Sequence, residues 1–114
     1  MEKIRTITLY KFYFTDFYNK QPPKVKDKIL WTFKVIEITQ YIPIQYFKHI
    51  EGTDGLYVMR ISKGSDIFRI FCFFDQGKII VLANGFQKKT QKTPKSEIEK
   101  ALKIKQEYEA EKTH

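Results

Sequence analysis

Three consecutive segments between residues 56 and 86 constrain the fold of this chain more than any other feature. They are rich in β-branched and aromatic residues and have the sequences LYVMRIS, DIFRIFCFF and KIIVLANGF. Two short polar links that contain glycine, KGSD and DQG, connect them. Strand-like segments joined by such short links favour antiparallel hairpins. The sequence therefore predicts a three-stranded meander against which the rest of the chain must pack.

The N-terminal residues predict one more strand and a short helix. Residues 4–10, IRTITLY, are rich in β-branched and aromatic types and partly alternate, which indicates an opening strand. Thr15 or Asp16 can cap a short helix that must end before Pro22 and Pro23, because the residue before a proline disfavours the helical conformation.

A longer helix is predicted from Pro23 to about Tyr41. One face carries apolar or small residues at helical spacing: Val25, Ile29, Thr32, Phe33 and Ile36. A second apolar stripe lies on the far side: Trp31, Val35 and Ile38. We expect the sheet to cover one side and the short helix the other, with a partner-binding surface as the alternative for the second stripe.

A final helix is predicted over residues 97–111, with Thr93 and Pro94 marking its start. Its apolar side is formed by Ile98, Ala101, Leu102 and Tyr108. The order of elements predicts an α+β fold with an antiparallel sheet of about four strands. All three helices are expected on one face of this sheet, so that the other face is open to a ligand. No shift of composition divides the chain, and we expect a single domain over residues 1–114.

The charge is strongly positive and unevenly distributed. The chain has 21 Lys and Arg residues against 13 acidic ones, a formal charge of +8, whereas residues 94–114 hold five Lys and five Glu and are neutral. No acidic residue lies between Asp75 and Glu97, and this stretch holds a basic cluster: Lys88, Lys89 and Lys92. Such an excess favours phosphate polyanions or an acidic protein partner, and charge alone does not choose between them. With the hydroxyl groups of Thr90 and Thr93, the cluster forms a candidate phosphate-binding loop.

The sequence lacks the residues that several kinds of catalysis require. The chain has two histidines, His49 and His114, and one cysteine, Cys72, with no metal-binding or nucleotide-binding motif, so we expect no metal and no cofactor. His49 is interpreted as a surface or satisfied polar residue. An enzyme built from this chain would have to use Lys, Arg, Tyr, Thr and backbone groups. RNA as a substrate permits that, because it supplies its own 2′-hydroxyl nucleophile.

The expected location is the cytoplasm. Cys72 lies in the apolar run IFCFF and is predicted to be a buried small hydrophobic residue, which suits a reducing compartment. No apolar stretch approaches the ~20 residues that span a membrane, and no signal core follows the N-terminal charges. We therefore expect neither a secreted nor a membrane-embedded protein.

Three segments together carry a family likeness: GLYVMRI, DIFRIFCFF and IIVLANGFQKKTQKTPKSEIEKALKIKQEY. The chain resembles the RelE/ParE toxin superfamily and, within it, the HigB-like, phage-derived Gp49-like branch. The resemblance implies a RelE-like α+β fold and a toxin of a type II toxin and antitoxin system. It also implies cleavage of mRNA on the ribosome by a metal-independent endoribonuclease, an mRNA interferase. The partners implied are the ribosome, mRNA and an antitoxin, expected to be a small helix-turn-helix protein.

The same resemblance suggests the site. Arg69 matches the strand arginine of the family, and Lys88 or Lys89 matches its basic position after the glycine, so these three are the candidate catalytic residues. Candidate RNA-binding or phosphate-binding residues are Arg60, Lys92, Thr90 and Thr93.

Structural alternatives accompany both arginines. Arg60 can instead pair with a backbone group or an acid, and Arg69 can lie over the rings of Phe71 or Phe73. The chain also departs from the family because no clear tyrosine follows the basic loop, so a lysine such as Lys89, with a pKa lowered by neighbouring charge, becomes a candidate acid or base.

Two other functions fit the sequence. ParE-like relatives poison DNA gyrase without cutting RNA, and a basic nucleic-acid-binding phage regulator would need no catalysis at all. Whether the chain is an enzyme is left open by its sequence.

Overall fold

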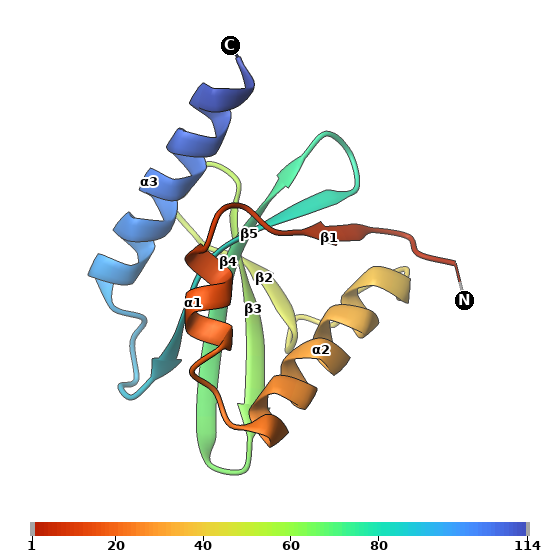
Figure 1. Cartoon of the computed structure of the whole chain (residues 1–114), viewed down its shortest axis with the longest axis vertical. Coiled ribbons are helices and arrows are strands. Elements are labelled where there is room, and N and C mark those ends of the chain that lie inside the picture. Colours follow the sequence, from red (N-terminus) through yellow and green to blue (C-terminus); the bar gives the residue numbers. More distant parts are fainter. Residues whose placement is uncertain (1, 114) are drawn as a thin grey trace.

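The computed structural model describes residues 2–113 and has a five-stranded sheet and three helices (Figure 1). The strand order across the sheet is β1-β5-β4-β3-β2. In chain order the elements are β1 (Thr6–Thr8), α1 (Tyr13–Tyr18), α2 (Pro23–Ile38), β2 (Phe47–His49), β3 (Leu56–Lys63), β4 (Asp66–Asp75), β5 (Ile79–Lys88) and α3 (Lys95–Lys112). The predicted α+β class is confirmed.

The predicted meander is also confirmed. β3, β4 and β5 pair antiparallel in sequence order, and each connection turns at a glycine with positive φ, +61° at Gly64 and +66° at Gly77. Glycine adopts this conformation without the steric cost that a Cβ atom would add. The short polar links therefore do form the hairpin turns.

The sheet differs from the prediction at both edges. β2, a three-residue strand, adds a fifth strand beside β3, and β1 pairs with β5 in parallel, so the sheet is mixed rather than antiparallel. The opening strand is also shorter than residues 4–10. The backbone N–H groups of Ile4 and Arg5 donate instead to the carbonyl oxygen of Glu37 in α2, at 2.6 and 3.1 Å. Because these two N–H groups bond to α2, Ile4 and Arg5 are not part of strand β1.

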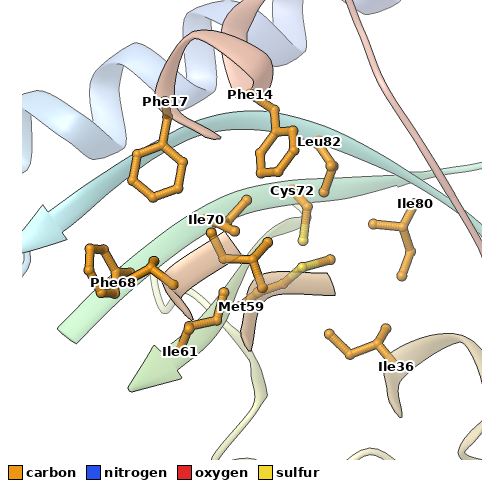
Figure 2. Packing of buried hydrophobic residues seen from close by; sticks show 12 residues of the cluster. Phe14, Phe17, Ile36, Met59, Ile61, Phe68, Ile70, Cys72, Ile80 and Leu82 are labelled. Carbon is orange, nitrogen blue, oxygen red and sulfur yellow. The ribbon is translucent and has the colours of Figure 1, made fainter. Parts of the chain in front are cut away.

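The helices cover both faces of the sheet, and the expectation that all three lie on one face is wrong. α1 and α2 pack on one face, where Phe14 and Phe17 of α1 lie over Ile70 and Cys72 of β4 (Figure 2). α3 packs on the opposite face, where Ala101 and other apolar residues meet Leu56, Val58, Phe71, Phe73, Val81 and Ala83. The nearly continuous apolar run of β4 explains this arrangement, because a strand that is apolar on both sides needs cover on both sides.

A β-bulge interrupts the pairing of β4 with β5. Ile70 lies opposite Gly85 and Cys72 lies opposite Leu82, so Phe71 alone faces two residues of β5, Ala83 and Asn84. Side chains alternate along a strand, and one extra residue exchanges the two faces for everything that follows it. Beyond the bulge, Phe86 and Lys88 therefore point to the face that carries α3. The buried Asn84 side chain donates to Glu97 of α3, to its backbone oxygen at 3.3 Å and to Oε1 at 3.0 Å.

The N-terminal helices differ from the prediction in their ends. Phe12, and not Thr15 or Asp16, is the N-cap of α1, with no side-chain cap bond. α2 stops at Ile38, before Tyr41, and the Arg5 guanidinium closes its end. That group donates to three carbonyl oxygens at 2.7–3.0 Å: Ile36, Thr39 and Gln40. A cation at this end also interacts favourably with the helix dipole.

Only one face of α2 is fully covered. The predicted inner residues Val25, Ile29, Thr32 and Ile36 are buried, but Trp31 is 46% exposed, so burial on two sides is wrong. α1 covers the inner face near Phe33, whose ring lies 5.4 Å from that of Phe14.

Polar contacts hold the far end of α3 against the sheet. The Tyr108 hydroxyl and the Lys112 ammonium both donate to Asp75 Oδ2, at 2.5 and 2.6 Å. These bonds lower the pKa of the Asp75 carboxyl.

Among the helices of residues 2–113, none combines the length and apolar character that crossing a membrane requires.

Two neighbouring residues of α2 test this packing. Ile29 is fully buried whereas Leu30 is 51% exposed, although they are similar in size. We expect Ile29→Ala to lower the free energy of unfolding by about 2–5 kcal/mol through a lost core contact and a cavity. Leu30→Ala should cost less than about 0.5 kcal/mol, and chemical denaturation of both variants measures the difference. Equal losses would show that the inner face of α2 is assigned incorrectly.

Candidate anion-binding cleft

A cleft of about 290 Å³ lies on the α3 side of the sheet, beyond the part that α3 covers. Its floor comes from β3 and β4, and its walls come from the segment around β2 and from the start of α3. The charged and polar lining residues are Lys48, His49, Glu51, Arg60, Arg69, Lys88 and Thr93. Basic side chains thus outnumber acidic ones, with Glu51 as the carboxylate of this lining.

Three adjacent strands bring the central cations together. Arg60 of β3 lies directly opposite Arg69 of β4. Arg69 lies opposite Phe86, and Lys88 follows two residues later on the same face of β5. The bulge is essential here, because a regular β5 would point Lys88 at the face covered by α1. The stacked rings of Phe71 and Phe86, 5.7 Å apart, separate the cluster from the core under α3.

The clustered charges disfavour the charged forms of Lys88 and Arg69. The pKa of Lys88 is lowered by burial first and then by the charges of Arg69 and Arg60. Burial and the charge of Arg60 likewise lower the pKa of Arg69. A bound anion would relieve both effects, because it offsets the repulsion and replaces lost hydration. The cleft is therefore suited to a phosphate.

The side chains of the two arginines are also available to a ligand. The Arg60 Nε atom is buried and has no hydrogen-bond partner within residues 2–113, so the alternative that Arg60 pairs with an acid is not what the structure shows. Arg69 donates through one terminal nitrogen to the carbonyl oxygen of Phe68 at 3.1 Å. In the described part of the chain it makes no cation–π contact with Phe71 or Phe73, where Lys105 lies over Phe73 instead. A buried donor without a partner costs free energy that a phosphate oxygen would recover.

The other predicted site residues divide between two surfaces. Thr93 lines the cleft with the arginines. Lys89 and Thr90 line a neighbouring depression of about 710 Å³, and Lys88 lines both. Lys92 lines neither, although its carbonyl oxygen accepts a bond from the Thr90 hydroxyl at 2.7 Å. Lys88, rather than Lys89, is the lysine that meets Arg69.

The sequence does not indicate that Lys48, His49 and Glu51 line the cleft. Lys48 of β2 pairs with Val58 and shares its face of the sheet, whereas His49 pairs with Tyr57, whose ring lies on the other face. A three-residue strand leaves no periodic signal from which their location could be inferred. The exposed His49 ring packs edge-on against Tyr57, 5.2 Å between ring centres, with Nε2 3.0 Å from the carbonyl oxygen of Thr53. The interpretation of His49 as a polar surface residue agrees with these contacts.

Cys72 is fully buried beneath α1 and α2, where burial raises the pKa of its thiol. It lies on the face opposite the cleft, as a small hydrophobic residue of the core. Within residues 2–113, no three His, Cys, Asp or Glu side chains are grouped so that they could hold a metal ion.

Fold and site together define a small basic α+β protein with a cationic cleft on one face of its sheet. Residues 16–106 match the family described as phage-derived protein Gp49-like (DUF891), and the chain belongs to this family, which is of the RelE/ParE-like toxin kind. Membership is consistent with a toxin of a toxin and antitoxin pair, and it suggests an antitoxin as partner. No curated protein matches the chain.

The effect of the Arg60 charge on the pKa of Lys88 should be measurable. We expect Arg60→Gln to raise the pKa of Lys88, because the substitution removes one of the two cations that lower it. Titration of the ¹³C-labelled lysine side chains by NMR gives this value. Lys34→Gln, a change on α2 at the other face of the sheet, should leave the Lys88 titration where it is. An unchanged or lower Lys88 pKa in Arg60→Gln would contradict the clustering.

Proposed function

We propose that the chain is a ribosome-dependent mRNA interferase, a metal-independent endoribonuclease that arrests translation. The observation that carries the proposal is the convergence of Arg60, Arg69 and Lys88 on one cleft, within a chain of the Gp49-like family. A ribosomal target implies action in the cytoplasm.

The cluster suits the charge that develops during RNA cleavage. When the 2′-oxygen attacks the adjacent phosphorus atom, negative charge builds on the phosphate oxygens before the 5′-oxygen leaves. Arg60 and Arg69 present fixed donors in a partly dehydrated cleft, where they stabilise that charge more strongly than they would in water. The products of this route are a 2′,3′-cyclic phosphate and a free 5′-hydroxyl.

Cleavage needs a proton donor for the departing 5′-oxygen and an acceptor for the proton of the 2′-hydroxyl. Lys88, with its lowered pKa, can donate a proton more readily than an ordinary lysine. The 2′-hydroxyl proton passes to solvent water, because the His49 ring packs against Tyr57 on the other face of the sheet. Lys88 thus acts as the acid for which the basic loop offers no tyrosine.

Single substitutions separate the cleft from the remainder of the charged surface. We expect Arg69→Ala and Lys88→Ala each to lower the cleavage rate by roughly ten-fold to a thousand-fold, because each removes a preorganised charge from the transition state. Lys89→Ala should have a smaller effect, since Lys89 lines the neighbouring depression. Primer extension on a translated message, at matched soluble concentrations, measures the rates.

Lys103→Ala is the matched control, because Lys103 is exposed on the neutral α3. Its cleavage rate should equal that of the parent. Full activity in Arg69→Ala, together with loss of activity in Lys103→Ala, would show that the catalytic site lies outside this cleft.

Expression in cells tests the toxin function. Induction should arrest growth, coexpressed antitoxin should restore it, and RNA from arrested cells should carry cyclic phosphate ends. Growth arrest with DNA damage and intact message would favour a gyrase poison. Normal growth with confirmed folded protein would favour a non-enzymatic regulator.

A further inference from the structure

A half-exposed tryptophan lies on the outer side of α2. Trp31 is 46% exposed, and its ring centre lies 5.7 Å from that of Tyr46, with the two ring planes inclined at 73°. The Lys28 ammonium group lies over the indole, 4.3 Å from the ring centre. Two aromatic rings and a cation thus share one open surface, which we call the Trp31 platform: Lys28, Trp31 and Tyr46.

The surroundings of the Trp31 platform are positively charged. Residues 20–48 hold six lysines against two acids. Lys24 and Lys28 share a stripe of α2 with Trp31, because the spacing i, i+4, i+7 keeps side chains on one side of a helix. In residues 2–113 no carboxylate lies within 4 Å of either ammonium group. The charge of these two lysines is therefore available to an anionic ligand.

The Trp31 platform adjoins the cleft around the edge of the sheet. β2 is the outermost strand on this side (Figure 1), and the residue before it, Tyr46, contacts α2 through its ring. The carbonyl oxygen of Tyr46 accepts a hydrogen bond from the N–H group of Arg60 at 2.9 Å. Two residues further along the chain, Lys48 lines the cleft together with Arg60. One short segment thus carries a platform residue at its start and a cleft residue at its end.

This combination of side chains suits single-stranded nucleic acid. Bases of a single strand stack on aromatic rings, and cations beside the rings bind the phosphates that follow along the strand. In a duplex the base faces are already stacked on one another, so an exposed indole favours unpaired bases. Charge alone would also attract an acidic protein. The continuity of the platform with the cationic cleft favours RNA, because one strand can contact both.

We propose that the Trp31 platform stacks a base of a single-stranded RNA whose backbone continues into the cleft. The strand passes around the β2 edge, and the Lys28 ammonium group binds a phosphate beside the stacked base. That this strand is a message rests on the proposed function, whereas the aromatic pair and its charges do not.

Intrinsic fluorescence reports on the platform alone, because Trp31 is the single tryptophan of the chain. The probe is a thymidine oligodeoxynucleotide of about 12 residues, which has no 2′-hydroxyl and is not cut by attack of that group. We expect it to quench the emission of Trp31 saturably, since a stacked base contacts the indole. A matched abasic oligomer keeps the phosphates and lacks the bases. It should bind about ten-fold more weakly and quench little.

Substitutions separate stacking from charge, with the anisotropy of a labelled oligomer as the measure of binding. Trp31→Ala should lower the affinity by about ten-fold, and Trp31→Phe should restore part of it, because a phenyl ring still stacks. Lys28→Gln should lessen the slope of log affinity against log salt by about 0.7, the effect of one phosphate contact on a single strand. Phe12→Ala is the control, since Phe12 is 74% exposed but lies at the start of α1. It should bind as the parent does, and thermal unfolding checks that each variant is folded.

Equal affinity for the two oligomers, or parent-like affinity in Trp31→Ala, would overturn the proposal. Emission that changes with the concentration of the chain alone would show instead that a second copy covers the indole. Quenching by a polyglutamate peptide, and not by the oligomer, would show that the platform receives an acidic protein. None of these measurements requires cleavage. A chain that stacks the oligomer but cuts no message would therefore keep the platform and lose the nuclease function, and the reverse result would remove the platform alone.

Discussion

The extra residue that β5 carries opposite Phe71 is the constraint on which the rest of the structure depends. Both faces of the central strands are buried, so each β5 side chain must point either to the layer of α1 and α2 or to the layer of α3. Because of the bulge, Leu82 points to the layer of α1 and α2, whereas Lys88 points to the layer of α3. It also directs Asn84 to α3, where its bonds to Glu97 fix the start of the helix that borders the cleft. One irregularity thus brings Lys88 into the cleft and fixes the position of the cleft wall.

The two-layer arrangement lets the faces of the sheet differ in chemistry. On the α3 side, the apolar layer stops short of the strand ends, and the uncovered stretch holds the cation cluster. On the other side, α1 and α2 leave exposed apolar side chains between them. Mutual repulsion among Arg60, Arg69 and Lys88 is a cost of the free state, and the tightly packed core beneath them limits how far the strands can move apart. The packed core therefore keeps the three cations close together in the absence of a bound anion.

The predictable parts of this fold are those with a repeated pattern. Hydrophobic periodicity identified the meander and the buried face of α2, because burial of one face repeats every two residues or every three to four residues. The bulge has no such signal, since Asn84 and Gly85 fit a strand end equally well. β2 is too short for a period, and the residues that it brings to the cleft were missed with it. The choice between Lys88 and Lys89 could not be made either, because neighbouring residues on a strand point to opposite faces.

The parallel pairing of β1 with β5 has a consequence for the order of synthesis. Thr6 is made early, but its partner Ile79 lies far along the chain. Lys88 is made later still. The nascent chain therefore cannot assemble the cleft until most of its length has left the ribosome, because long-range pairing has to wait for both strands. The cleft is therefore among the last parts of the protein to form during synthesis.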